Sequence, residues 1–161
     1  MLDLRLPISV LDLPSYEWSM MWRVAVAAIL AGLPGLEREF RRKPAGFRTH
    51  MIIGASCALM VMLGRVLLEQ YSHLPNPEQI RTDPLRIFEA IVVGVSFIGA
   101  GTILKVEDSM RIRYLTTAAS LLFAAAIGIS VALDLFFLAA FECVLILVIN
   151  LGLGRLEKEI N

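Results

Sequence analysis

Residues 35–51 have the sequence Gly-Leu-Glu-Arg-Glu-Phe-Arg-Arg-Lys-Pro-Ala-Gly-Phe-Arg-Thr-His-Met, and they separate the first two long apolar runs of the chain. Five of the fifteen Lys and Arg residues lie in this segment: Arg38, Arg41, Arg42, Lys43 and Arg48. Positive charge beside membrane-length segments is retained on the cytoplasmic side. We therefore expect residues 35–51 to form a cytoplasmic connection that fixes the topology.

The composition favours a membrane protein. The chain has 161 residues, of which 57% are hydrophobic, and its mean hydropathy is +0.71. Fifteen acidic residues balance fifteen basic ones, so there is no basic excess of the kind that nucleic-acid binding requires. Cys57 and Cys143 lie inside apolar runs without a Cys/His cluster, and we expect them to be small core residues.

Five apolar segments are long enough to cross a bilayer: residues 18–36, 51–68, 87–104, 114–133 and 135–153. At about 1.5 Å per residue each reaches about 27–30 Å, close to the thickness of the hydrocarbon core. The sequence therefore predicts an all-α membrane protein, a bundle of five transmembrane helices within residues 18–153. Residues 1–17 are expected to be extracytoplasmic or interfacial, and residues 154–161 to form a cytoplasmic tail.

The distribution of positive charge predicts the orientation. With residues 35–51 inside, ten Lys and Arg residues fall on the cytoplasmic side and five on the outer side. This excess places the N-terminus outside and the C-terminus in the cytoplasm. Arg23, near the outer end of the first span, is expected to extend its side chain outward.

The acidic residues at the end of the first span need cations nearby, because the helix dipole disfavours negative charge there. We expect Glu37 to pair with Arg48 first, with Arg38 and Arg41 as alternatives. Two interpretations of this group stay open: an ion-paired anchor, or a polar site at the cytoplasmic mouth of the bundle that could hold Mg²⁺. Pro34 is expected to break or kink the helix just before it.

Two helix starts carry capping residues. Asp83 before Pro84 is typical of a helix N-terminus, and Arg86 could pair with Asp83 or Glu89. Thr49 is the candidate cap of the second helix. Beyond capping, a polar functional cluster is predicted from Glu37, Arg38, Arg48, Thr49, Asp83 and Arg86.

Other polar residues lie within the spans themselves. Glu142 falls near the middle of the fifth span, where a carboxylate is costly and is a functional candidate, and Glu89 lies one turn into the third span. Thr117 and Ser120, like Thr116, could bond backbone carbonyls or neighbouring helices. His50 has no partner at metal-ligand spacing, and we expect it to be interfacial.

Small residues predict where the helices pack, since helices in lipid associate by close approach. Gly94, Gly99 and Gly101 lead to the expectation that the third span is central, with Gly94 and Gly101 touching neighbouring helices. The motif Gly54-x-x-x-Ala58 predicts a second packing face. The alternative use of such motifs is an interface between subunits.

Several ordered motifs resemble the MgtC/SapB family of bacterial membrane proteins. The segments are 35–39 (Gly-Leu-Glu-Arg-Glu), 43–50 (Lys-Pro-Ala-Gly-Phe-Arg-Thr-His), 83–86 (Asp-Pro-Leu-Arg), 94–101 (Gly-Val-Ser-Phe-Ile-Gly-Ala-Gly) and 115–120 (Leu-Thr-Thr-Ala-Ala-Ser). The resemblance implies a multi-pass inner-membrane protein linked to magnesium limitation and to survival of bacteria inside host cells. Some family members are thought to restrain other membrane proteins.

Two functions remain in competition. The first is a regulator or partner-binding module, whose partners are the bilayer, other membrane proteins and, as an open alternative, a second copy in a homodimer. The second is a Mg²⁺ transporter or channel with Glu37, Asp83, Glu89 and Glu142 along the path. An enzyme is not favoured, because no Ser/His/Asp, Cys/His or phosphate-loop arrangement is present. We expect no cofactor and no nucleic acid, leave Mg²⁺ as a candidate ligand, and favour regulation.

Overall fold

The computed structural model describes residues 13–72, 83, 85–105 and 112–160. Its elements are α1 (Leu13–Phe40), α2 (Phe47–Ser72), α3 (Leu85–Thr102), β1 (Leu104–Lys105), β2 (Ile112–Arg113), α4 (Leu115–Ala132) and α5 (Phe136–Ile160). The prediction of five helices is confirmed. The antiparallel pair β1–β2, in which Leu104 lies opposite Arg113, was not predicted.

By length and composition, four of the described helices could cross a membrane, within Glu17–Phe40, Phe47–Gln70, Leu85–Thr102 and Leu115–Ala132. The apolar part of α5, Phe136–Gly152, is shorter. Three helices, α1, α2 and α5, are longer than the predicted spans, whereas α4 lies within its predicted span and α3 is shifted by two residues toward the N-terminus. Of the expected N-terminal segment, residues 1–12 lie outside the described residues and the remainder belongs to α1. The expected tail is a continuation of α5 as far as Ile160, and Asn161 lies outside the described residues.

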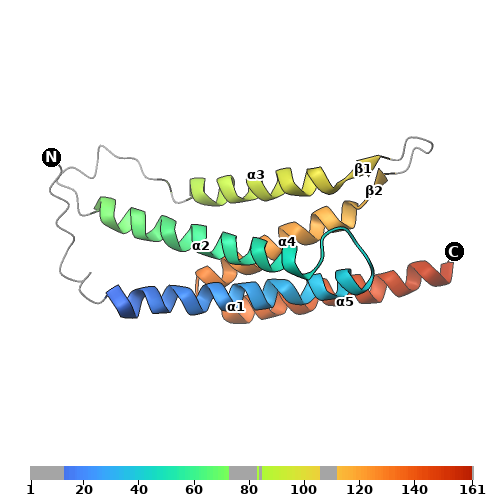
Figure 1. Ribbon diagram of the computed structural model, residues 1–161, viewed down its shortest axis with the longest axis horizontal. Coiled ribbons are helices and arrows are strands. Elements are labelled where there is room, and N and C mark those ends of the chain that lie inside the picture. Colours follow the sequence, from blue (N-terminus) through green and yellow to red (C-terminus); the bar gives the residue numbers. More distant parts are fainter. Residues whose placement is uncertain (1–12, 73–82, 84, 106–111, 161) are drawn as a thin grey trace.

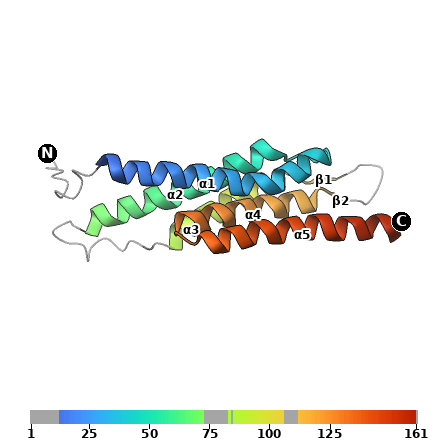
Figure 2. The same ribbon diagram turned by 90° about the horizontal axis from the view of Figure 1, so that it is seen from below.

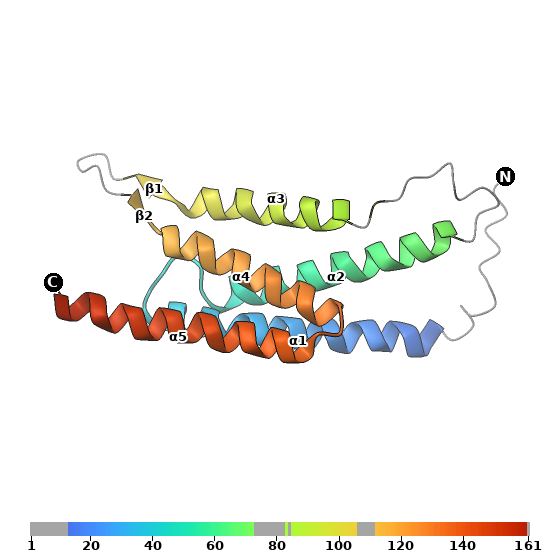
Figure 3. The same cartoon turned by 180° about the vertical axis from the view of Figure 1, so that it is seen from behind.

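The helices lie roughly along one long axis (Figure 1). In this view α3 runs along one edge and α1 and α5 lie at the opposite edge, with α2 and α4 between them. The views from below and from behind show α4 crossing through the middle of the bundle (Figures 2 and 3). The α1–α2 connection, the β1–β2 pair and the end of α5 lie toward the same end. We call this the connection end, and the end near the α4–α5 turn the opposite end.

The central helix is α4, which packs against α1, α2, α3 and α5. Its buried side includes Leu121, Ile127 and Val131, which have no exposed surface. By contrast, α3 buries only Ile91, Val95 and Gly99 among its described residues. The expectation that the third span is central is therefore wrong.

Two glycines allow α2 to approach α4 and α1 closely. A Cβ atom on Gly128 would collide with the carbonyl oxygen of Gly54, and one on Gly54 would collide with the Cβ of Ala31 and come within 3.0 Å of the carbonyl oxygen of Ala27. Only hydrogen side chains allow backbones to meet at this distance. Gly54 and Ala58 are both buried, so the packing face predicted from Gly54-x-x-x-Ala58 is confirmed.

The glycines of α3 have a different role from the one expected. Gly99 meets Ala118 of α4, whose Cβ would lie 3.4 Å from an added Cβ. Gly94 and Gly101 have nothing within 4 Å of that position, and both are exposed. The prediction that they touch neighbouring helices is wrong, because the face of α3 that carries them points away from α2 and α4.

Pro34 does not break α1, which continues through it to Phe40. The proline is fully buried. The charged residues Glu37, Arg38 and Glu39 are therefore part of the helix. Their side chains are positioned by α1 itself, rather than by a flexible connection.

Candidate functional site

Four buried polar side chains join α1, α2 and α4 at the connection end: Arg38, His50, Thr117 and Ser120. We call them the Arg38–His50 cluster. Each is at most 3% exposed, although polar groups of this kind are costly to bury unless they are bonded. Residues from three helices thus meet at one position, and the interactions among them determine what the cluster can bind.

Arg38 extends from the last turn of α1 to the first turn of α4, where its Nη2 donates a hydrogen bond to Oγ1 of Thr117. Its Nε is buried without a hydrogen-bond partner. No carboxylate among the described residues pairs with the guanidinium. This is unusual, because a buried charge normally requires an opposite charge to offset its lost hydration.

His50 is fully buried between the start of α2 and α4. Its Nδ1 lies 2.9 Å from the carbonyl oxygen of Gly46, and its Nε2 lies 3.2 Å from Oγ of Ser120. Because a carbonyl oxygen can only accept, the contact with Gly46 assigns a proton to Nδ1. The expectation that His50 is interfacial is wrong, since the residue is fully buried and its Nε2 connects α2 with Ser120 of α4, while its Nδ1 bonds to Gly46 just before α2.

Ser120 links the histidine to the backbone of α4. Its hydroxyl donates to the carbonyl oxygen of Thr117 at 2.8 Å, as expected for a hydroxyl inside a helix. Thr117 and Ser120 were predicted to bond carbonyls or neighbouring helices, and both do so. The equally suggested Thr116 is exposed on the same helix.

The two carboxylates in the last turns of α1, Glu37 and Glu39, both have partners at the connection end. Glu37 pairs with Arg41, one turn further along, so the alternative partner is confirmed and the first choice, Arg48, is wrong. The spacing of four residues brings Glu37 and Arg41 to the same face of the helix. Arg48 is exposed and has no carboxylate partner within the described part of the chain.

Glu39 caps the second helix. Its Oε2 accepts a hydrogen bond of 2.9 Å from the amide of Phe47, the first residue of α2. Thr49 lies inside the first turn and makes no capping bond, so the prediction that it caps α2 is wrong. A carboxylate at a helix N-terminus also interacts favourably with the helix dipole.

Asp83 caps α3 as predicted, since its Oδ1 accepts from the amide of Leu85 at 2.9 Å. Arg86 makes no ion pair with Asp83 or Glu89, and all three residues are exposed. The start of α3 lies at the opposite end of the bundle from the α1–α2 connection (Figure 1). The structure therefore does not bring Asp83 and Arg86 together with Glu37, Arg38, Arg48 and Thr49.

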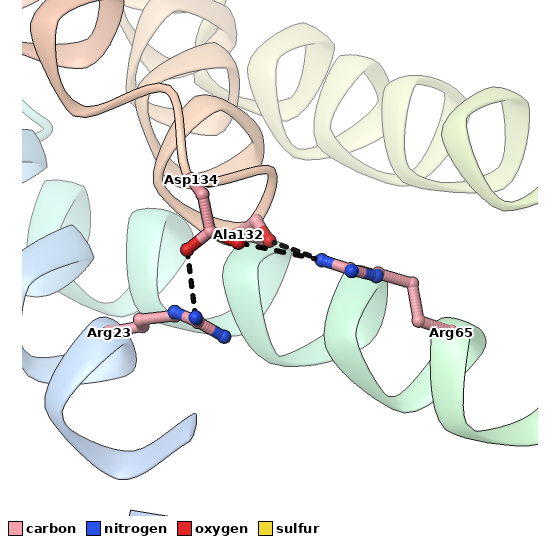
Figure 4. Close-up of polar contacts among 4 residues, drawn as sticks. All are labelled: Arg23, Arg65, Ala132 and Asp134. Atoms are coloured by element: carbon pink, nitrogen blue, oxygen red, sulfur yellow. Dashed lines mark hydrogen bonds and ion pairs between the residues drawn. The ribbon is translucent and has the colours of Figure 1, made fainter. Parts of the chain in front are cut away.

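A second polar group lies at the opposite end, where Arg23 of α1 and Arg65 of α2 approach Asp134 (Figure 4). Arg23 Nη2 is 2.9 Å from Oδ1 of Asp134, and Arg65 Nη1 is 3.9 Å from Oδ2. Arg65 also donates to the carbonyl oxygen of Ala132 at 3.3 Å. We call Arg23, Arg65 and Asp134 the Asp134 cluster. Arg23 thus makes an ion pair with Asp134 that was not predicted, and its predicted outward extension stays a prediction.

Asp134 was not identified from the sequence. It occupies the α4–α5 turn with a positive φ of 65°, a conformation that aspartate tolerates better than most residues. Next to it, the rings of Trp22 and Phe136 stack with centroids 5.3 Å apart. The available signal was the position of Asp134 between two apolar spans. A carboxylate in such a turn can form ion pairs with cationic side chains of neighbouring helices.

Glu142 lies two turns into α5 and is partly buried. Its Oε1 accepts a hydrogen bond of 3.2 Å from Ser130 of α4. Its Oε2 is buried without a partner. Among the described residues, no group of three or more His, Cys, Asp or Glu is arranged to hold a metal ion.

Comparison with known proteins identifies the family. The MgtC family model matches residues 24–159, from α1 to the end of α5. The chain belongs to the MgtC family. Together with the apolar helices, this membership indicates a membrane protein.

Three relatives illustrate the similarity of this MgtC-family chain to curated proteins. It is 36% identical over 127 residues to "Putative magnesium transporter YhiD" of Escherichia coli (strain K12), and this match covers 79% of the chain and 57% of YhiD. It is 33% identical over 131 residues to Protein SapB of Bacillus subtilis (strain 168), covering 81% and 54%. It is 34% identical over 138 residues to Protein MgtC of Brucella abortus (strain 2308), covering 86% and 52%.

The chain spans about half the length of these MgtC-family relatives. No solved structure matches it.

Proposed function

We propose that this MgtC-family chain resides in the bacterial inner membrane and acts in adaptation to low magnesium by regulating other membrane proteins. In this proposal the connection end, which carries the exposed cations Arg42, Lys43 and Arg48, faces the cytoplasm. The N-terminus is then outside and the C-terminus inside, and all five helices cross the bilayer.

The observation that carries the proposal is the tight apolar packing of helices in the part of the bundle that lies between the two polar clusters. Between the Arg38–His50 cluster and the Asp134 cluster, α1, α2 and α4 meet through small buried residues: Ala27, Ala31, Gly54, Ala124 and Gly128. Mg²⁺ gives up its hydration reluctantly and needs water or oxygen ligands along a conducting path. Backbones in direct contact, as at Gly54 and Gly128, leave no room for that path.

One observation favours the alternative, a Mg²⁺ transporter or channel. The buried Oε2 of Glu142 has no partner, and such an atom is a potential cation ligand. The name of YhiD describes the same activity for that protein. We give this function second place, because a single carboxylate does not provide ligands through the apolar contact between α2 and α4.

Complementation in cells separates the two functions. The chain is expressed in a bacterial strain that lacks MgtC-family proteins and grows poorly at low magnesium, and both growth and the initial rate of Mg²⁺ uptake are measured. The proposal predicts restored growth with an unchanged uptake rate. Restored growth with faster uptake that is lost in Glu142→Gln would support the transporter instead, and no restoration would contradict both.

A further inference from the structure

Arg38 is the most unusual charged group in the described part of the chain. It is 3% exposed, its Nε has no partner, and its one hydrogen bond goes to the neutral hydroxyl of Thr117. The two nearest carboxylates along α1 are otherwise engaged, since Glu37 pairs with Arg41 and Glu39 caps Phe47. Glu37 is close enough to attract the guanidinium, but no carboxylate among the described residues forms the ion pair with it that normally offsets the burial of a cation.

The first turn of α4 lacks an acceptor as well. Its N-cap residue, Tyr114, makes no side-chain capping bond and has a positive φ of 71°. The first amide of the helix to bond within this turn is that of Ala118, which donates to the carbonyl oxygen of Tyr114 at 3.1 Å. The amides of Leu115, Thr116 and Thr117 have no acceptor among the described residues, although a side-chain oxygen usually accepts one of them.

These two features coincide. Thr117 belongs to the uncapped turn and is also the residue that Arg38 contacts. The guanidinium thus lies beside the positive end of the α4 dipole, where a cation is unfavourable without an anion nearby. Leu115 and Thr116 are exposed on this turn, whereas Arg38 and Thr117 are buried, so a ligand would approach the turn from the side of Leu115 and Thr116. His50, the other titratable group of the cluster, is bonded to Gly46 and Ser120.

We propose that Arg38 and the first turn of α4 together bind a phosphate oxyanion. Helix N-termini bind phosphate through free amides and the dipole, and guanidinium groups form charge-assisted hydrogen bonds with it. The exposed cation Arg113, just before α4, adds long-range attraction. The oxyanion belongs either to a phospholipid headgroup or to inorganic phosphate. This site does not depend on whether the chain regulates or transports.

The test uses the purified full chain and measures its thermal unfolding in two arms. In the first arm, sodium phosphate is titrated in an uncharged detergent at constant ionic strength. In the second arm, the chain is placed in nanodiscs in a phosphate-free buffer, and phosphatidylglycerol, whose headgroup has a net negative charge, replaces the zwitterionic phosphatidylcholine stepwise. A ligand that binds only the folded chain raises the unfolding temperature in a saturable manner. The arm that shows this rise identifies the source of the oxyanion.

A matched pair of variants at an exposed position locates the site. Thr116→Glu places a carboxylate in the uncapped turn and should raise the unfolding temperature without ligand while abolishing the ligand-dependent rise. Thr116→Gln has the same shape without the charge and should respond like the wild type. Arg38→Gln should weaken the apparent affinity by about tenfold or more. If Arg38→Gln fails to fold, the comparison of Thr116→Glu with Thr116→Gln still shows whether the ligand binds at the first turn of α4.

Two results would overturn the proposal. One is a ligand-dependent rise in Thr116→Glu equal to that of the wild type, which would place the binding elsewhere, such as on Arg42 or Arg48. The other is no saturable rise for the wild type in either arm. In that case the anion beside Arg38 would have to be an acidic side chain of a partner protein.

Discussion

Gly128 of α4 lies directly against the backbone of Gly54 in α2, so that a methyl group on Gly128 would overlap the carbonyl oxygen of Gly54. This contact occupies the middle of the helix bundle, between the Arg38–His50 cluster and the Asp134 cluster. It holds the two polar ends apart and closes the space between them. The proposed function and the predicted effects of mutations both depend on it.

The glycines of α2 and α3 should respond differently to the same substitution. We predict that Gly54→Leu strongly lowers folded yield and thermal stability, because its side chain would meet Ala31 and the backbone of α1. Overpacking of a tight site typically costs about 1–3 kcal/mol, occasionally more. Gly94→Leu is the matched control on α3, where nothing lies within 4 Å.

Gly94→Leu should unfold within a few degrees of the wild type, as followed by tryptophan fluorescence of the purified protein. Comparable losses in both variants would show that Gly94 is packed, by another helix or by a second copy of the chain. Size-exclusion chromatography with light scattering separates these two possibilities.

The number and type of helices could be predicted from the sequence, because the length of an apolar run reflects the thickness of a bilayer. The face that each helix buries could not. In lipid, both the outward and the inward faces are apolar, so Gly94 and Gly54 look alike in the sequence although one is exposed and the other is in van der Waals contact. In soluble proteins, hydrophobic periodicity predicts which face of a helix is buried, but in a membrane bundle it is a weak predictor.

The candidate site was predictable only where its contacts are local. The pair of Glu37 with Arg41 follows from the spacing of four residues along a helix, and Asp83 follows from capping rules. The contact of His50 with Ser120 joins positions 70 residues apart, and that of Arg38 with Thr117 joins positions 79 apart. Such contacts depend on how α4 crosses the bundle, which local sequence does not determine.

The ion pair at the opposite end should make a small, salt-dependent contribution to stability. Asp134→Asn removes the charge but keeps a side chain that tolerates a positive φ, so it should cost about 1 kcal/mol or less at low salt. Asp134→Ala should cost more, because it adds backbone strain at φ 65°.

The measurement is the thermal unfolding of both variants at low and high salt, with Arg23→Gln as the partner change. The effect of Asp134→Asn should shrink at high salt, and the double variant Arg23→Gln/Asp134→Asn should lose less than the sum of the single changes. Full additivity would contradict the pairing of Arg23 with Asp134.

The start of α2 should depend on Glu39 rather than on Thr49. Loss of the cap in Glu39→Ala should destabilise the chain by about 0.5–2 kcal/mol, the usual range for helix N-caps. Thr49→Ala should have a smaller effect, because Thr49 lies within the helix and makes no capping bond. A larger loss from Thr49→Ala than from Glu39→Ala in thermal unfolding would contradict the observed cap.

The proposed topology can be tested with single cysteines in a background in which the two native cysteines are replaced by alanine. Cys57 and Cys143 are buried, so their replacement should change labelling little. A cysteine at Lys43 should react with a membrane-impermeant maleimide only after the spheroplasts are opened. A cysteine at Leu135, in the exposed α4–α5 turn, should react from outside. The reverse pattern would invert the orientation.

The account rests most directly on the claim that the chain does not conduct Mg²⁺. Purified wild-type protein is reconstituted into liposomes that contain a magnesium indicator, and Mg²⁺ entry is compared with empty liposomes and with Glu142→Gln. Because the bundle is closed at Gly54 and Gly128, we predict that entry into wild-type proteoliposomes is no faster than into empty ones. Saturable Mg²⁺ entry above that level, abolished by Glu142→Gln, would contradict the account and establish the transporter.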